Sequence, residues 1–279
     1  MSPAALVVAG IAAGALLAAT VALALIRRPP AGAARTNIRG LTVPAVLGGP
    51  LVAAGAGLAL TPGSLTLSAR IGGSVAGLCV ALGAAGFLDD VHGDRGARGF
   101  RGHLRAALSG RVTTGLLKLL VGGAGGLAAG VTVADSWQVL TTALMVALST
   151  NLFNLLDVAP GRAGKVGVAL WIPLLVWGSE EWAVASAGVL GALLVCLPLD
   201  LKERAMLGDA GANPLGAVVG LGLALALPSW AATIAIVLLL ALNLSSELWS
   251  FSAIIERVGP LRALDRLGRD NPPHDASAE

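Results

Sequence analysis

Apolar stretches of close to 20 residues recur from one end of this chain to the other. The apolar segments lie at residues 4–26, 43–60, 71–88, 114–133, 136–150, 166–178, 182–199, 211–228 and 230–249. About 20 apolar residues in a helix cross the ~30 Å core of a bilayer, and the alternating pattern of a membrane barrel is missing. Charged residues make up 13% of the 279 residues, about half the share of an average globular domain. We therefore predict an all-α, polytopic transmembrane helix bundle with about nine spans, which excludes a soluble globular domain and a disordered chain.

The basic residues predict how this bundle is oriented. If the amino end lies outside and the spans alternate, all of the 19 Lys and Arg except Arg70 fall on the inner side. The positive-inside rule then favours a multi-pass protein of the cytoplasmic membrane with an outer N-terminus and a cytoplasmic C-terminus. This distribution accounts for the net charge of +3 without a nucleic-acid partner. The outer boundaries hold the aromatic belt expected there, made of Trp137, Trp177, Trp182 and Trp230.

The chain divides into a membrane-embedded domain at residues 1–250 and a basic amphipathic cytoplasmic tail at residues 251–279. Apolar residues recur in the tail at three- and four-residue steps, with Arg257, Arg262 and Arg266 off that stripe. Gly259-Pro260 is expected to break the tail into two short helices. Such an element either lies flat on the anionic inner leaflet or also walls one side of a site at the inner face.

Polar residues gather at the inner ends of the apolar segments. Asp89 and Asp90 are adjacent carboxylates at a membrane boundary, which repel each other unless a cation or basic groups hold them; a solvated pair of loop acids is the alternative. Asn151, Asn154 and Asp157 recur every three residues and so follow one stripe of a helix. Three polar groups on one side of an apolar helix end suit a ligand or a metal better than lipid.

Two further inner segments carry polar residues. Asp209 stands between glycines where the eighth apolar segment begins, a place where helix N-termini bind anions and a carboxylate can offer oxygen to Mg²⁺; a capping aspartate is the alternative. The arginine-rich loop 91–113 contains His92 and His103 without metal-ligand spacing, and most of its arginines serve the orientation. Lys118 lies just inside the fourth apolar segment.

Taken together, these residues indicate a phosphate site on the inner face. Carboxylates from three inner loops, with Lys118 close by, fit Mg²⁺-assisted handling of a phosphate. Zn²⁺ is not expected, because no cluster of Cys or His is available.

The order of these motifs resembles a known family. The motifs are Gly86-Phe-Leu-Asp89-Asp90, Thr114-Gly-Leu-Leu-Lys118, Asn151-x-x-Asn154-x-x-Asp157 and Leu207-Gly-Asp209-Ala-Gly211-Ala. Over roughly residues 35–220 the chain resembles the polyprenyl-phosphate N-acetylhexosamine-1-phosphate transferase superfamily (glycosyltransferase family 4). That superfamily includes the phospho-N-acetylmuramoyl-pentapeptide transferase and the UDP-N-acetylglucosamine–undecaprenyl-phosphate N-acetylglucosamine-1-phosphate transferases.

The resemblance implies a reaction and roles for residues. A polyprenyl phosphate attacks the β-phosphate of a UDP-activated amino sugar, giving polyprenyl-diphospho-sugar and UMP for cell-wall or surface glycan synthesis. By analogy Asp209 binds Mg²⁺, Asp89 and Asp90 form the catalytic acid pair that orients or deprotonates the acceptor phosphate, and Lys118 contacts phosphate. The residues implied on the substrate-binding side are Asn151, Asn154 and Asp157.

The chain departs from the family pattern after the Asn motif. Pro160 stands where relatives commonly carry a second acid, and Arg162 and Lys165 add positive charge nearby. These two side chains are predicted to bind the donor diphosphate, with a simple positive-inside pair as the equal alternative. The His-rich motif and the tenth span of the peptidoglycan translocase are also missing, which favours a divergent relative with another sugar donor.

Other classes remain open from the sequence. A catalytically silent envelope-assembly scaffold of the same fold would share every motif, and only an assay separates it from the enzyme. A transporter is less favoured because charged residues are nearly absent from the segment centres, and a CDP-alcohol phosphotransferase is supported only by a motif fragment. Besides lipid and nucleotide-sugar partners, association of two copies as a homodimer is an option that the sequence leaves open.

Overall fold

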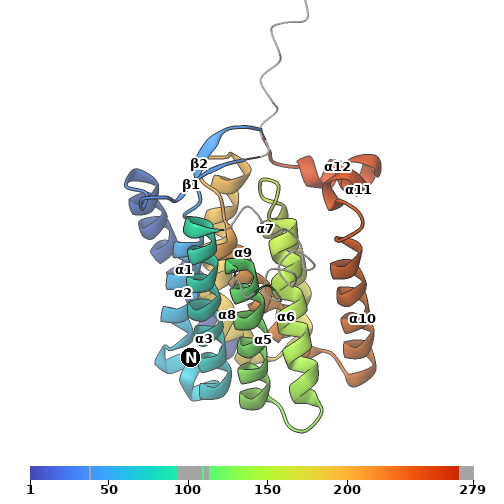
Figure 1. Ribbon diagram of the computed structural model, residues 1–279. Coiled ribbons are helices and arrows are strands. Elements are labelled where there is room, and N and C mark those ends of the chain that lie inside the picture. Colours follow the sequence, from blue (N-terminus) through green and yellow to red (C-terminus); the bar gives the residue numbers. More distant parts are fainter. Residues whose placement is uncertain (38, 94–108, 110–112, 270–279) are drawn as a thin grey trace, which may run out of the picture.

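The computed structural model of the protein describes residues 1–37, 39–93, 109 and 113–269 (Figure 1). It is 78% helical with almost no sheet, so the predicted helical bundle is confirmed at that level. The predicted arginine-rich loop, with Arg95, Arg98, Arg101, Arg105, Arg111 and His103, and the tail end 270–279 fall almost entirely outside the described residues.

Each of the predicted apolar segments contains or overlaps a helix of its own. These helices are α1 (Pro3–Arg27), α2 (Gly48–Ala59), α3 (Pro62–His92), α5 (Thr114–Val133), α6 (Gln138–Leu156), α7 (Arg162–Trp177), α8 (Glu180–Leu201), α9 (Asp209–Ala226) and α10 (Ser229–Ser245). Two short helices, α11 (Phe251–Arg257) and α12 (Gly259–Arg266), follow in the tail, and Pro260 stands in the first turn of α12. The predicted break at Gly259-Pro260 is therefore confirmed.

The helices differ in whether they are long enough to cross a membrane. In the described residues, α1, α3, α5, α6, α8 and α9 are the 6 helices with sufficient length and hydropathy. Helices α2, α7 and α10 have 12, 16 and 17 residues, which at 1.5 Å per residue gives roughly 18–26 Å. The structure thus supports a membrane protein, while the count of nine spans and the orientation stay predictions.

Helices α8 and α9 form the centre of the bundle. Residues 182–193 of α8 and 210–222 of α9 are buried on every side. Trp182 belongs to this core: its indole Nε1 donates to the Val218 carbonyl at 2.9 Å, and its ring centroid lies 5.1 Å from that of Trp171. The prediction that Trp182 joins an aromatic belt is therefore wrong, because packing between α7, α8 and α9 takes its side chain inward. Trp137, Trp177 and Trp230 are exposed.

A two-stranded antiparallel hairpin is the one departure from an all-α chain in the described residues. Its strands are β1 (Ala34–Thr36) and β2 (Thr42–Pro44). Backbone bonds tie it to the turn before α9, from Met206 N to the Pro44 carbonyl (2.8 Å) and from Leu47 N to the Met206 carbonyl (3.1 Å). The hairpin therefore fixes the turn that leads into Asp209.

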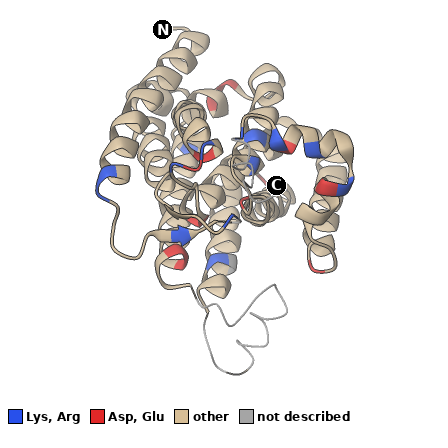
Figure 2. Cartoon of the chain, turned by 90° about the horizontal axis from the view of Figure 1, so that it is seen from above, with Lys and Arg blue, Asp and Glu red and all other residues tan. Residues whose placement is uncertain are grey.

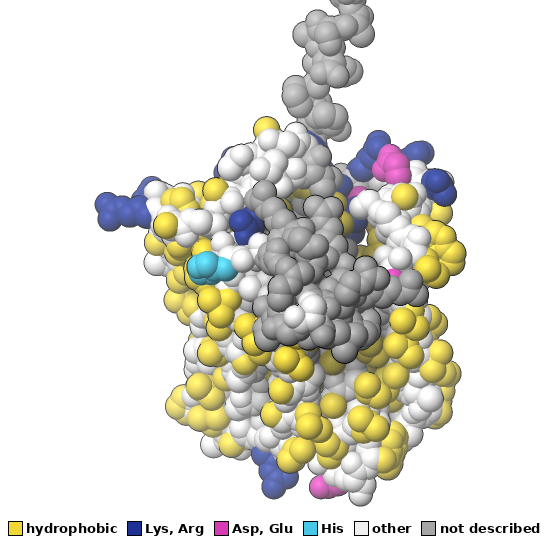
Figure 3. All heavy atoms as spheres, in the orientation of Figure 1, with side chains coloured by type: hydrophobic (Ala, Val, Ile, Leu, Met, Phe, Trp, Pro, Cys, Tyr) yellow, Lys and Arg dark blue, Asp and Glu magenta, His cyan; other side chains and the backbone are white. Residues whose placement is uncertain are grey.

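The two ends of the bundle differ in character. The hairpin, the end of α3 and the pair α11–α12 lie at one end, and the α5–α6 and α9–α10 connections lie at the other (Figure 1). Seen from above, Lys and Arg stand beside Asp and Glu at several helix ends (Figure 2). On the face in Figure 3, hydrophobic side chains are spread widely over the lower part of the molecule. We call the end that carries the hairpin the polar end.

Candidate active site

Three helices bring Asp89, Lys118 and Asp209 together at the polar end. The Lys118 ammonium Nζ lies 2.6 Å from Asp89 Oδ2 and also forms an ion pair with Asp209 Oδ2. The side chains of Lys118, Asp89 and Asp209 are 14%, 18% and 23% exposed, so they are largely desolvated but still reachable. This carboxylate–lysine cluster joins predicted residues from α3, α5 and α9, which lie far apart in the sequence.

Local structure explains how the three helices meet. Gly86 lies one turn before Asp90, and a Cβ atom there would collide with the Asp209 carbonyl, so only glycine lets α3 approach the start of α9 this closely. Helix α5 begins after Thr113, whose Oγ1 accepts a hydrogen bond from Leu116 N at 3.1 Å. This cap fixes the helix start and thereby places Lys118 in its second turn.

Asp90 caps α9 and is not ion-paired with Lys118 among the described contacts. Its Oδ1 and Oδ2 accept hydrogen bonds from the backbone N–H groups of Asp209 (3.2 Å) and Ala210 (3.0 Å). Gly208 makes room for this contact with a φ of 68°, and a Cβ atom there would lie 2.8 Å from Asp90 Oδ2. Neighbours on a helix diverge by about 100°, which explains why Asp89 and Asp90 have different partners.

The Asn motif lies at the end of α6. Asn151 Nδ2 donates to Asn243 Oδ1 of α10 at 2.6 Å, which links these two helices. Within the described residues, Asn154 Oδ1 is buried and has no hydrogen-bond partner. Asp157 follows the helix and accepts a backbone hydrogen bond from Gly208, and burial together with the Asp200 carboxylate raises its pKa well above the ordinary value. Asp157 therefore faces the turn that leads into Asp209.

Asp200 was missed by the sequence analysis. Its Oδ2 accepts a hydrogen bond from Gly161 N at 2.9 Å, and its carboxylate also accepts from Leu207 N. It is buried at the end of α8 and ties the loop after Asp157 to the turn before Asp209. The signal in the sequence was a lone acid after Pro198 at the inner end of an apolar run.

Arg162 and Lys165 do not join the carboxylate–lysine cluster. The Arg162 guanidinium pairs with Asp265 of α12, and Lys165 Nζ donates to backbone carbonyls at the end of that helix. Their contact with a donor diphosphate stays a prediction. The structure shows what holds the two side chains in the protein itself.

The pKa of Lys165 reports on the charges around it. Burial, followed by the positive charge of Arg269, lowers the pKa of Lys165 to about 8, against the opposing effect of Asp265. We expect Arg269→Gln to raise the Lys165 pKa and Asp265→Asn to lower it further. Titration of methyl-¹³C-labelled lysines by NMR measures this, and only Lys118, Lys165 and Lys202 need to be assigned. A Lys165 pKa above 10 in the unmodified chain contradicts the arrangement.

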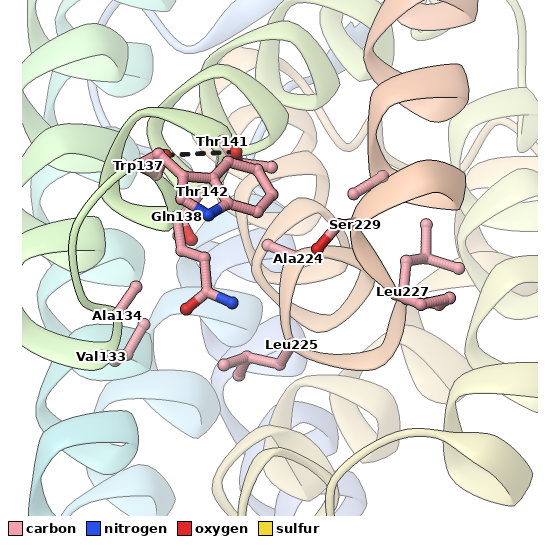
Figure 4. Close-up of a pocket in the computed structure, with 12 residues that line it drawn as sticks. Val133, Ala134, Trp137, Gln138, Thr141, Thr142, Ala224, Leu225, Leu227 and Ser229 are labelled. Atoms are coloured by element: carbon pink, nitrogen blue, oxygen red, sulfur yellow. Dashed lines mark hydrogen bonds between the residues drawn. The ribbon is translucent and has the colours of Figure 1, made fainter.

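A cavity lies at the end of the bundle opposite to the polar end. Its volume is about 210 Å³, and it is bounded by the ends of α5 and α9 and the starts of α6 and α10. Gln138, Thr141, Thr142 and Ser229 line it beside Trp137, and no charged side chain does so among the described residues (Figure 4). The carboxylate–lysine cluster lies instead where α5 and α9 begin. A phosphate therefore finds charged partners at the polar end.

A comparison with known families identifies the family of the chain. The sequence model of Glycosyl transferase family 4 matches residues 73–228, more than half of the chain. The matched range contains all nine predicted site residues. The fold and the site define the protein as a helical membrane bundle with a polar cluster at one end. The chain belongs to glycosyl transferase family 4, the family of polyprenyl-phosphate hexosamine-1-phosphate transferases. No match to the chain is found among curated proteins.

Proposed function

We propose that this protein transfers a sugar-1-phosphate from a UDP-activated amino sugar to a polyprenyl phosphate at the inner leaflet of the cytoplasmic membrane. The observation that carries the proposal is the convergence of Asp89, Lys118 and Asp209 at one end of the bundle, inside the matched family range. An oxygen of the lipid phosphate forms a bond to the β-phosphorus of the donor, and the bond between the α- and β-phosphates breaks. The products are polyprenyl-diphospho-sugar and UMP, for cell-wall or surface glycan synthesis.

The residues present fit a Mg²⁺ ion. Carboxylates of Asp89 and Asp209 already share one cation, the Lys118 ammonium, so their oxygens point to a common place. In the described part of the chain, no group of three or more His, Cys, Asp or Glu is placed to hold a metal. Mg²⁺ usually takes one or two protein carboxylates together with substrate phosphates and water. Asp209, with Asp89 beside it, would hold the ion, which when bound neutralises charge on the diphosphate.

The roles of the other site residues follow from their positions and from the family resemblance. Asp89 orients the acceptor phosphate or accepts its proton, because its carboxylate belongs to the carboxylate–lysine cluster, and the Lys118 ammonium contacts phosphate oxygen. Asn154 and Asp157 are assigned to the donor side by the family resemblance, and the Oδ1 of Asn154, which has no partner among the described residues, is an acceptor that a donor N–H or O–H could use. Positioning and charge neutralisation dominate phosphoryl transfer, so these roles suffice for the reaction. Asp90 contributes by holding the start of α9.

A transfer assay tests the proposal. Purified protein in liposomes would receive undecaprenyl phosphate, Mg²⁺ and a panel of UDP-sugars, with UMP release and lipid product both measured. We expect UMP release that requires the lipid and one amino-sugar donor. Release without lipid overturns the reaction, and the absence of product with every donor favours the silent scaffold of the same fold.

A further inference from the structure

The C-terminal segment, residues 251–269, is held by a set of polar contacts that the proposed reaction leaves unused. Arg162 Nε and Nη2 donate to the two carboxylate oxygens of Asp265 at 2.7 and 3.1 Å, and Arg162 Nη1 donates to Ser252 Oγ at 3.0 Å. One buried guanidinium thus contacts both α11 and α12. The two partners of the ion pair are only 7% and 8% exposed, and a bidentate geometry is the strong form of this contact.

Two more basic side chains complete the attachment. Lys165 Nζ donates to the carbonyls of Leu264 (2.8 Å), Asp265 (2.5 Å) and Leu267 (3.2 Å), and so covers the C-terminal end of α12. Arg269 donates from Nη2 to Asp265 Oδ1 (2.7 Å) and from Nε to the Pro160 carbonyl (2.8 Å). We call Arg162, Lys165, Asp265 and Arg269 the clasp.

Apolar packing contributes little to holding this segment. No residue of α11 is buried, and in α12 only Asp265 is. An open cavity of about 390 Å³ lies between this segment and α7, and it is bordered by Ile255 of α11, by Leu261 and Leu264 of α12 and by Leu267, which follows α12. Because the buried contacts are polar and centred on one carboxylate, the clasp decides whether the segment stays in place.

The clasp acts on the loop that carries Asp157. Arg269 holds the Pro160 carbonyl from one side, and Asp200 holds Gly161 N from the other at 2.9 Å. Between these two contacts and the end of α6, the loop has little freedom, and Asp157 reaches the Gly208 backbone from it. The chain has Pro160 where relatives commonly carry an acid. Because proline has no polar side chain and no backbone N–H, its carbonyl is the group through which Arg269 can hold the loop at this position.

We infer that Asp265 and Arg162 are positioning residues, which fix the Asp157–Gly161 loop for the nucleotide-sugar by clasping the C-terminal segment onto it. Only the positioning of the loop for the nucleotide-sugar rests on the proposed function. The clasp itself is a structural statement about two segments of the chain. Arg162 and Lys165 accordingly act on the donor through the loop and not by direct contact.

The clasp is tested by protease protection of the full chain in detergent. Trypsin needs an unfolded stretch around its cleavage site, so docked helices are cut slowly after Arg257, Arg262 and Arg266. We expect Asp265→Ala and Arg162→Ala each to speed cleavage there roughly tenfold or more, as removing one partner of a buried pair is strongly disruptive. The effects of the two substitutions should be less than additive in the double variant, because each single variant already removes the Arg162–Asp265 pair.

Two further variants keep the test decisive. Glu256→Ala removes the exposed Glu256–Arg266 pair in the same segment, whose side chains are 52% and 64% exposed, and should leave cleavage unchanged. Arg269→Gln breaks two clasp contacts without leaving Arg162 unpaired, and it should speed cleavage less than Asp265→Ala does. This variant still tests the clasp if the Ala variants fail to fold. Unchanged cleavage in Asp265→Ala, or additive effects in the double variant, overturns the clasp.

The positioning half is tested by kinetics on the same variants. We expect Asp265→Ala to raise the Michaelis constant for the nucleotide-sugar about tenfold and to leave that for the polyprenyl phosphate unchanged. Faster cleavage with an unchanged donor constant overturns positioning while the clasp stands. If the unmodified protein transfers nothing, the proposed function fails, and the protease result still decides the clasp.

Discussion

Replacing Asp209 by Asn is expected to lower transfer by about 10²–10³-fold, the range found when one electrostatic stabiliser is removed, while the bundle stays folded. The carboxylate stands at the first position of α9, ion-paired with Lys118 and close to Asp89. The amide keeps the shape of the side chain but loses the charge that attracts Mg²⁺. Turnover measured at saturating substrates, together with a thermal unfolding scan, separates a loss of catalysis from a loss of folding.

Two controls belong to this experiment. Glu180→Gln removes an exposed acid at the opposite end of the bundle, at the start of α8, and should leave turnover unchanged. Raising the Mg²⁺ concentration should recover part of the activity of Asp209→Asn if the lost charge served the metal. Near-normal activity of the variant at low Mg²⁺ would show that Asp209 holds no metal.

Hydropathy and motif order predicted the helical part of the fold well. Each apolar segment contains or overlaps a helix, because uninterrupted runs of Leu, Val and Ala leave the backbone no other way to satisfy its hydrogen bonds in lipid. Composition did not predict which helices lie in the core. Trp182 looked like an interfacial tryptophan, yet its indole reaches the Val218 carbonyl inside the bundle, since only tertiary packing determines that α8 lies at the centre.

The site was predictable in its members more than in their partners. Sequence order placed Asp89, Lys118 and Asp209 at one end of three helices, and the structure brings them together. The partners of Arg162 and Asp157 were not predictable, because they come from Asp265 and Gly208, far along the chain. A contact made by a backbone N–H or by a distant carboxylate leaves no pattern within one segment.

The adjacent acids Asp89 and Asp90 should respond very differently to substitution. Asp89→Asn removes a charge from the carboxylate–lysine cluster, and we expect turnover to fall by about 10²–10³-fold with little change in thermal stability. Asp90→Ala removes the acceptor of two backbone N–H groups at the start of α9, one buried and one partly buried. Leaving such donors unpaired costs about 1–3 kcal/mol of folding free energy each, so here the unfolding temperature should fall.

Temperature separates these two mechanisms. Loss of activity in Asp90→Ala should be recovered largely on cooling, because its active site re-forms when α9 is again held in place. Loss in Asp89→Asn should persist at every temperature, since the missing charge is part of the cluster itself. Equal and mild losses in the two variants would show that the pair shares one role. That outcome would contradict the different partners of Asp89, which pairs with Lys118, and of Asp90, which accepts from Ala210 N.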